Sequence, residues 1–246
     1  MPKIENNISQ VTDRVEQAAR DANRDPGDIL LLAVSKTRNA EDIRCAISAG
    51  LINFGENYVQ EALEKIALLS QELDREQLCW HFIGPLQSNK TRVVAENFNW
   101  VHSVDRLKIA QRLSEQRPAQ LGPLNICLQV NIDNEASKSG FSSDETLSAA
   151  LEIIKLPNLH LRGLMAIPQS QPTVEQQSIA FQALHNLRDQ INRSLDNSKK
   201  LDTLSMGMSN DLEAAILQGS TIVRVGTDIF GKRDTKNSLK ESNKND

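Results

Sequence analysis

The sequence predicts a single α/β domain folded as a TIM-like (β/α)8 barrel. The chain has 246 residues, close to the roughly 250 that such a barrel typically uses. Eight short apolar segments alternate with stretches of helical periodicity, and no linker interrupts the alternation near the middle of the chain. A doubly wound parallel sheet is the alternative for alternating strands and helices. Eight evenly spaced units favour the closed barrel over that sheet.

The first predicted elements are a helix and a strand. Apolar residues recur with helical period from Ser9 to Asn23, and we expect this extra N-terminal helix to close one end of the barrel. A turn at residues 24–28 precedes the unbroken apolar run of residues 29–34. Such a run is typical of a strand buried on both faces of a parallel sheet. Lys36 therefore lies at the carboxyl end of the first strand.

Seven further strands are expected, and seven of the eight strands precede a clear helical pattern. The strands are expected at residues 51–55, 78–84, 100–104, 124–132, 159–167, 203–205 and 221–226. The helices between them are expected at residues 40–50, 57–69, 89–96, 105–113, 142–154, 173–191 and 211–217. Asn39, Ser142 and Thr173 have the side chains of N-caps. The barrel is expected to end at residue 231, and the polar residues 232–246 are expected to form a disordered tail.

The composition argues against several classes of partner. The net charge of −4 and the pI near 5.7 give no positive surface for nucleic acid or an anionic membrane. No apolar run approaches the roughly 20 residues of a membrane span, and the polar N-terminus lacks a signal-peptide core. We therefore expect a cytoplasmic protein, and a monomer because no exposed apolar helix face stands out. The cysteines are expected to be buried and to behave as small hydrophobic residues; they are Cys45, Cys79 and Cys127. Neither the cysteines nor the histidines show the spacing of metal ligands.

Chemically useful residues follow several of the predicted strands. In a barrel the carboxyl ends of all strands lie on one face, so residues there can converge. This set comprises Lys36, Asn57, His81, Met165, Ser205 and Gly226. The loops after strands seven and eight, residues 205–209 and 226–227, are where barrel enzymes often hold a phosphate. Their glycines let the backbone approach an anion, and their hydroxyls add hydrogen-bond donors.

Arg224 lies within the eighth apolar strand, where a charge is costly unless it is paired. It could face a carboxylate inside the barrel or a bound ligand. A nearby cation and partial burial would lower the pKa of the Lys36 amine, which suits formation of a Schiff base with a carbonyl compound. A phosphorylated aldehyde such as pyridoxal phosphate satisfies both the lysine and the phosphate loops. A phosphosugar enzyme of the aldolase type remains open from spacing alone.

Longer motifs resemble the pyridoxal-phosphate homeostasis proteins, the YggS/PROSC family, and they extend over nearly the whole chain. The matching stretches are residues 33–37, 54–61, 80–90, 162–165, 205–209 and 223–227. This resemblance implies a barrel like the N-terminal domain of alanine racemase and pyridoxal phosphate as the cofactor. The chain departs from the family pattern at Asp228, a position that is often alanine in relatives, and after residues 231–234, where a tyrosine is lacking.

The resemblance also implies roles for individual residues. Lys36 is the Schiff-base lysine, and Arg224 faces the pyridine nitrogen and keeps it unprotonated. The residues that hold the phosphate are Ser205, Gly207, Ser209, Gly226 and Thr227. The residues that line the ring are Asn57, His81 and Met165. Lys138, in the polar loop after strand five, is a weaker candidate for a second cofactor contact, and a solvated loop lysine is the favoured interpretation.

Two functions are compatible with this site. The resemblance implies a non-catalytic carrier that buffers or delivers pyridoxal phosphate, with cofactor-dependent apoenzymes as candidate partners. The alternative is an amino-acid racemase, which needs a base on each face of the cofactor and takes the second, a tyrosine, from another domain. Only 15 residues follow Gly231, so no such domain is expected. The single tyrosine, Tyr58, is expected to pack at the start of a helix.

Overall fold

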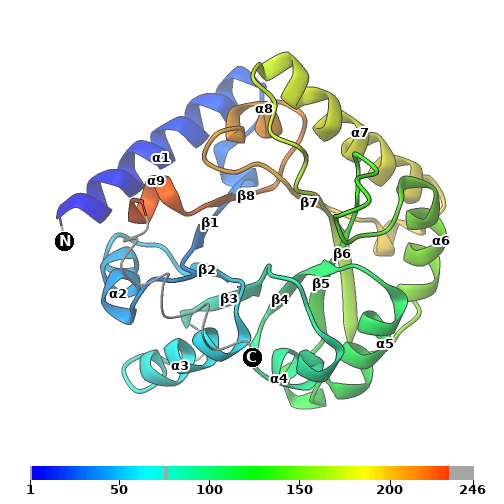
Figure 1. Ribbon diagram of the computed structural model, residues 1–246, viewed down its shortest axis with the longest axis horizontal. Coiled ribbons are helices and arrows are strands. Elements are labelled where there is room, and N and C mark those ends of the chain that lie inside the picture. The colour runs from blue at the N-terminus through cyan, green and yellow to red at the C-terminus, as the bar shows by residue number, and fades with distance from the viewer. Residues whose placement is uncertain (1, 75–76, 233–246) are drawn as a thin grey trace.

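The computed structural model describes residues 2–74 and 77–232, and its centre is a closed parallel barrel (Figure 1). Each strand pairs with its neighbour in chain order, and β8 pairs with β1. The strands are β1 (Leu30–Val34), β2 (Asn53–Glu56), β3 (Cys79–Phe82), β4 (Trp100–Val104), β5 (Leu124–Gln129), β6 (Leu159–Met165), β7 (Thr203–Ser205) and β8 (Ile222–Val225). The predicted barrel is confirmed, and the doubly wound sheet is wrong because the two edge strands of such a sheet are here paired.

Helices surround the barrel and alternate with the strands (Figure 1). They are α1 (Pro2–Asp21), α2 (Ala40–Ser48), α3 (Val59–Leu69), α4 (Thr91–Asn97), α5 (Leu107–Gln116), α6 (Ser143–Ile153), α7 (Val174–Arg193), α8 (Leu212–Leu217) and α9 (Thr227–Phe230). Short 3-10 turns lie at Pro26–Asp28, Ser88–Lys90, Ala119–Leu121 and Asn197–Lys199. The predicted caps are confirmed, since the side chains of Asn39, Ser142 and Thr173 each accept a backbone N–H of the first helical turn.

The N-terminal helix differs from its prediction in both extent and place. It begins at Pro2, so Ser9 lies inside the helix and not at its start. The helix does not close the end of the barrel; it lies in the outer ring against α8, α9 and α2 (Figure 1). The reason is that α9 has only four residues, too few to cover β8 and β1. The buried stripe of α1, which includes Val11, Val15 and Ala19, covers them instead.

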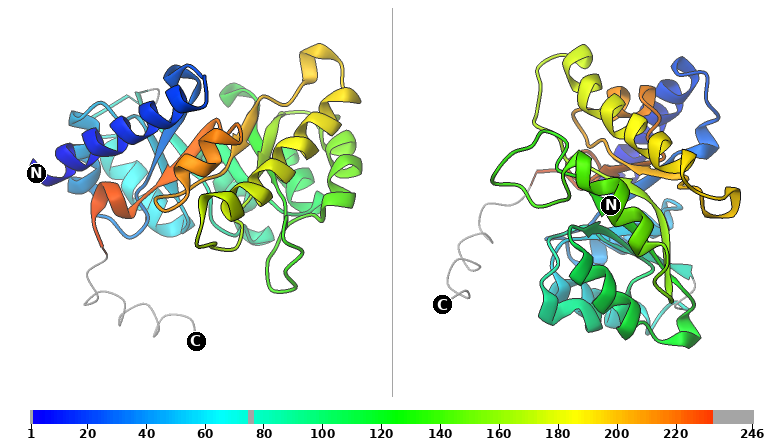
Figure 2. Two further views of the ribbon diagram at one scale, coloured as in Figure 1. Left: turned by 90° about the horizontal axis from the view of Figure 1, so that it is seen from above. Right: turned by 90° about the vertical axis from the view of Figure 1, so that its right-hand side faces the viewer.

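The fifth and sixth strands end earlier than the sequence predicts, at Gln129 and Met165. Beyond β5 the chain forms one isolated bridge, from Val130 to Phe141, and turns at Asn134, whose φ is +52°. Apolar residues continue past both strand ends, so the apolar pattern alone extends the strands too far. The loop between β5 and α6 projects from the barrel, as the green loop in Figure 2 shows.

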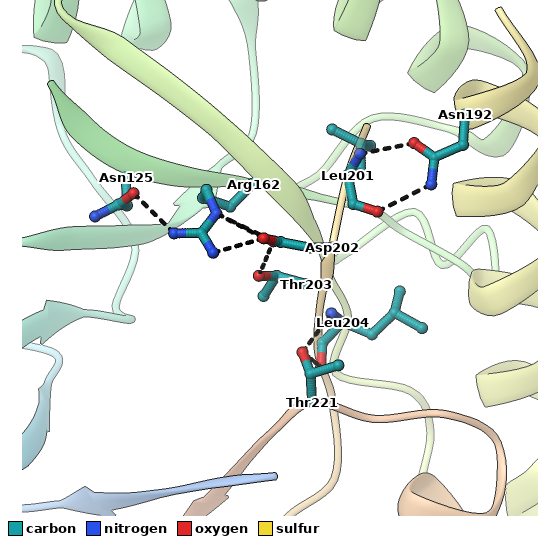
Figure 3. Close-up of polar contacts among 8 residues, drawn as sticks. All are labelled: Asn125, Arg162, Asn192, Leu201, Asp202, Thr203, Leu204 and Thr221. Atoms are coloured by element: carbon teal, nitrogen blue, oxygen red, sulfur yellow. Dashed lines mark hydrogen bonds and ion pairs between the residues drawn. The ribbon is translucent and has the colours of Figure 1, made fainter. Parts of the chain in front are cut away.

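Polar side chains join the strands at the amino end of the barrel (Figure 3). Arg162 of β6 forms an ion pair with Asp202 at 2.6 Å and donates to Asn125 of β5 at 3.3 Å. The hydroxyl of Thr221 accepts the backbone N–H of Leu204 at 2.9 Å. These contacts connect β5, β6, β7 and the start of β8. The carboxyl end of the barrel remains for a ligand, as is usual for this architecture.

Several smaller predictions can be compared with the described residues. Cys45 and Cys127 are buried as expected, whereas Cys79 is partly exposed, with its thiol 3.3 Å from His81 Nε2. No helix among residues 2–74 and 77–232 combines the length and apolarity that a bilayer crossing requires. The domain end at residue 231 stays a prediction. The predicted disordered tail lies outside the described residues, apart from Lys232.

Candidate functional site

A cavity of about 350 Å³ opens at the carboxyl ends of the strands. Six of its lining residues are candidates from the sequence: Lys36, Asn57, Ser209, Arg224, Gly226 and Thr227. They come from the ends of β1, β2, β7 and β8, so the closed barrel brings together residues that are up to 191 positions apart in the chain. The other lining residues are Val34, Ile83, Ile167, Pro168, Ser170, Met208, Asn210 and Asp211.

Four sequence candidates lie outside this lining, at positions beneath or beside the cavity. Met165 is 1% exposed at the end of β6, and its carbonyl accepts the N–H of Val130. Gly207 has a φ of +91°, and a Cβ there would lie 2.5 Å from that of Ala215. Gly207 therefore allows close packing of the loop after β7 against α8, and its carbonyl accepts the N–H of Arg224.

The Ser205 hydroxyl is engaged beneath Arg224 and is not presented to the cavity. Arg224 Nη1 donates to both the carbonyl and the hydroxyl of Ser205, at 2.5 and 2.7 Å. The hydroxyl also lies 2.7 Å from His102 Nδ1. A hydroxyl that accepts from a guanidinium can donate its own proton to that imidazole nitrogen. Ser205 thus links Arg224 to the barrel interior, a role that differs from the expected phosphate contact.

His81 lies inside the barrel, next to His102. His81 Nδ1 is 2.9 Å from His102 Nε2, and His81 Nε2 is 3.1 Å from Asn53 Oδ1. Burial lowers the pKa of His81 to about 3 and lowers that of His102 well below its usual range, so both rings are neutral. A consistent proton arrangement runs from Ser205 through His102 and His81 to Asn53, each donating to the next. His81 was expected to line the cofactor ring, but its side chain lies inside the barrel and does not line the cavity.

Arg224 remains a cation although burial lowers its pKa to about 10. It is 5% exposed, and its Nη2 donates to the carbonyl of Ala166 at 2.9 Å. These bonds to Ser205 and Ala166 all go to neutral oxygens, so they orient the guanidinium without neutralising it. The partly buried carboxylate of Asp211 raises the pKa of Arg224 through space. Arg224 could pair with a carboxylate inside the barrel or face a bound ligand. Its hydrogen bonds to neutral oxygens and its place in the cavity lining favour the ligand.

A second cavity of about 230 Å³ adjoins the first. Asn57, Ile83 and Ile167 line both cavities, and Lys138 lines the second one. The Lys138 amine forms an ion pair with Glu135 and donates to the carbonyl of Ile167 at 3.1 Å. Lys138 is therefore a tethered loop lysine next to the site, not a fully solvated one.

The groups around the first cavity fit a phosphorylated aldehyde. Lys36 supplies an amine, Arg224 a buried cation, and Ser209 and Thr227 supply hydroxyls. Asn57 Oδ1 is buried and has no hydrogen-bond partner within the described chain, so an acceptor is available to a bound molecule. Among the residues the structure describes, no group of three or more histidine, cysteine or acidic side chains could hold a metal ion.

Two further residues noted in the sequence are Tyr58 and Asp228. Tyr58 is at the start of α3, as expected, but it is 49% exposed, so the expected packing role is wrong. Asp228, the departure from the family pattern, receives Arg14 Nη1 at 2.6 Å. The same guanidinium donates through Nη2 to the carbonyl of Ser209. Asp228 therefore joins α9 to α1, and Arg14 continues the contact to the loop that follows β7.

The chain is similar to one protein family along nearly its whole length. Residues 3–234 match the family model described as alanine racemase, N-terminal domain. The pyridoxal phosphate homeostasis protein of Pseudomonas aeruginosa is 58% identical over 236 residues, which cover 95% of this chain and 97% of that protein. The protein of the same name from Escherichia coli K12 is 50% identical over 241 residues, covering 95% of this chain and 98% of that one.

Solved structures agree with this placement. PipY of Synechococcus elongatus with pyridoxal phosphate bound matches with a TM-score of 0.76 and 34% identity, covering 88% of this chain and 99% of PipY. An alanine racemase of Clostridium difficile matches with a TM-score of 0.71 at 14% identity, covering 96% of this chain and 58% of the racemase. The racemase likeness shows the shared fold alone. From its sequence relatives and its barrel, the chain belongs to the pyridoxal phosphate homeostasis protein family, within the alanine racemase N-terminal domain fold.

Proposed function

We propose that this chain binds pyridoxal phosphate in the first cavity, holds it covalently on Lys36 as a Schiff base, and buffers or delivers it. One observation is central: an amine, a buried guanidinium and two hydroxyls line a single cavity at the carboxyl end of the barrel. The names of the close relatives and the bound cofactor in the PipY structure support this proposal. A phosphosugar aldolase has no comparable support.

The chemistry requires little from the protein beyond position. Pyridoxal phosphate, when bound, supplies an aldehyde that condenses with a lysine amine to an imine and releases one water. Lys36 Nζ provides the amine. Arg224, oriented by Ser205 and Ala166, donates a hydrogen bond toward the pyridine nitrogen and keeps a proton off it. That arrangement limits electron withdrawal by the ring, which suits holding the cofactor more than transforming amino acids.

The phosphate is assigned to the loops after β7 and β8. Ser209, Gly226 and Thr227 line the cavity at this point, and a Cβ on Gly226 would approach the carbonyl oxygen of Val34 at 3.2 Å. Gly207 and Ser205 serve the same loops as scaffold, through packing and through Arg224. Asn57 contacts the ring edge, with Met165 and His81 supporting the barrel below.

The carrier role is favoured over a racemase by the residues that line the cavity. Racemisation needs a base on each face of the cofactor. The only tyrosine of the chain, Tyr58, is half exposed at the start of α3. The carboxylate of Asp211 lines the cavity but accepts the N–H of Met208 at 2.6 Å. We therefore propose a non-catalytic protein of the cytoplasm, with cofactor-dependent apoenzymes as recipients and a monomeric state.

Lys36→Ala tests the covalent assignment. The wild-type chain mixed with pyridoxal phosphate should show a visible absorption band, and borohydride reduction followed by peptide mass spectrometry should place the cofactor on Lys36. Lys36→Ala should lose the band and the modified peptide, because Lys36 is the one lysine among the described residues that line this cavity. Lys138→Ala is the matched control and should retain both. A wild-type chain without an adduct at Lys36 contradicts the proposed function.

A further inference from the structure

A cluster of three charged residues, two of them buried, contacts the backbone on both sides of Lys36 and lies outside the proposed cofactor contacts. It consists of Glu56 at the end of β2 and of Glu61 and Lys65 on α3. Glu56 is 0% exposed and Lys65 is 6% exposed. Lys65 Nζ lies 2.7 Å from Glu56 Oε1 and 2.5 Å from Glu61 Oε1. One buried cation is therefore shared between a buried carboxyl group, that of Glu56, and a partly exposed one, that of Glu61.

The cluster holds the backbone on both sides of Lys36. Lys65 Nζ donates to the carbonyl of Ser35 at 2.7 Å, and Glu61 Oε1 accepts the N–H of Thr37 at 2.6 Å. The hydroxyl of Ser35 donates to Glu56 Oε1 at 2.6 Å. Each residue next to Lys36 is thus bonded to at least one member of the cluster. Bonds that involve an ionised partner are shorter and stronger than neutral ones.

The backbone at this point needs such support. Thr37 has a φ of +65°, in the left-handed region that β-branched residues rarely adopt. This residue turns the chain out of β1 immediately after Lys36. Since a local preference does not maintain that turn, a contact from elsewhere must do so, and Glu61 supplies it to the Thr37 N–H.

A purely structural role is a poor explanation for buried charges here. Burial raises the pKa of the Glu56 carboxyl, and its Oε2 has no hydrogen-bond partner in the described chain. Apolar residues of similar volume often replace buried ion pairs with no loss of stability. Apolar residues cannot form directed hydrogen bonds to the peptide groups of Ser35 and Thr37, which flank Lys36.

We propose that Glu61 and Lys65, with Glu56, form a clamp that positions the Lys36 amine for its bond to the cofactor aldehyde. They are positioning residues, acting through the Ser35 carbonyl and the Thr37 N–H. The inference rests on the proposed function, since it assigns Lys36 the covalent bond. It predicts that loss of the clamp affects covalent capture and leaves phosphate recognition intact, because the phosphate loops follow β7 and β8.

The test compares Glu61→Gln with Glu64→Gln, an identical change on the exposed side of the same helix. Each variant is titrated with pyridoxal phosphate and with pyridoxamine 5′-phosphate, which has no aldehyde. Loss of a charged hydrogen bond should raise the dissociation constant of pyridoxal phosphate by about tenfold in Glu61→Gln. The constant for pyridoxamine 5′-phosphate should change less than about twofold, and Glu64→Gln should match the wild type for both ligands.

The outcomes separate the two proposals. Equal weakening of both ligands, or no weakening of either, overturns the clamp while the wild-type adduct at Lys36 still stands. A wild-type chain without that adduct overturns the proposed function itself. If Glu61→Gln does not fold, Lys65→Arg is measured instead, since it retains the charge but displaces the donor, and it should show the same selective loss. Failure of both variants to fold overturns positioning in favour of a stabilising role.

Discussion

At the residue scale, the interior histidines connect the candidate site to the rest of the barrel. His102 lies between the Ser205 hydroxyl and His81, and Ser205 in turn holds Arg224. Neutral imidazole rings satisfy this series of hydrogen bonds, because each ring must accept at one nitrogen and donate at the other. Protonation of either ring would replace an acceptor by a donor and would leave a charge in the barrel interior.

This requirement predicts acid sensitivity. Burial lowers the pKa of His81 to about 3 from 6.5, so the unfolded chain binds more protons than the folded one below pH 6.5. The free energy of unfolding should therefore fall as the pH drops through this range, and His81 alone should account for about 2 kcal/mol of the loss between pH 7.5 and pH 5. Urea unfolding at both pH values measures this loss.

The matched variants for the pH experiment are His81→Gln and His160→Gln. Removing the buried His81 ring should take its contribution of about 2 kcal/mol out of this loss, while the contribution of His102 remains. His160 is exposed, and its replacement should leave the wild-type pH dependence. A His81→Gln protein that is as acid-sensitive as the wild type would assign the effect to other groups.

At the element scale, α1 supports the loop after β7. Its Arg14 forms ion pairs with Glu213 of α8 and Asp228 of α9 and also donates to the Ser209 carbonyl at 2.9 Å. Helix α1 thus takes the place of a full-length helix after β8, where α9 has only four residues, and it also restrains the predicted phosphate loop after β7. Arg14 is about one-third exposed, so the ion pairs alone contribute little, and the effect on the loop is the more informative one.

Arg14→Met should weaken every phosphorylated ligand. We expect the dissociation constants of pyridoxal phosphate and pyridoxamine 5′-phosphate to rise together, by up to about fivefold, as the Ser209 loop loses one hydrogen bond to α1. Arg20→Met is the control, because Arg20 lies on the same helix and forms an exposed ion pair with Glu16 of that helix. A selective loss for pyridoxal phosphate would instead connect α1 to Lys36.

At the scale of the whole molecule, the cavity lies at the carboxyl end of one closed barrel, where we propose a covalent bond at Lys36. A carrier needs Lys36 and the phosphate loops, whereas a racemase also needs a second base. Incubation with single L-amino acids, analysed by chiral chromatography, should yield no D-isomer above the level of free pyridoxal phosphate. Accumulation of D-isomers that Lys36→Ala abolishes would establish the racemase alternative. The exposed tyrosine variant Tyr58→Phe would then identify or exclude the second base.

The agreement between sequence and structure is best for features that depend on position along a strand. Lys36 and Gly226 follow apolar strands, and parallel strands bring their carboxyl ends to one face, so their convergence in a cavity was predictable. The prediction is poorer for Ser205 and His81. Their height along the barrel is right, but the competing partners Arg224 and His102 engage their side chains inside it.

Other features were not predictable from local pattern. The positions Glu61 and Lys65 are four apart on a helix, a spacing typical of a solvent-exposed ion pair. The outer position of α1 depends on the face of β8 and β1 that the short α9 leaves uncovered, which no local segment encodes. The register of the barrel likewise decides that Arg14 reaches Ser209, 195 residues away.

The sequence by itself determined the barrel, the order of its elements, the covalent lysine as a candidate and the family to which the chain belongs. Periodicity, capping residues and motifs are properties of neighbouring residues, and they are sufficient for these conclusions. Only the tertiary structure decided which candidates share the cavity, what orients Arg224, and that an acid–lysine–acid cluster around the buried Lys65 holds the backbone beside Lys36. Those are consequences of closing the barrel, because closure alone places side chains from distant strands and helices within hydrogen-bonding distance.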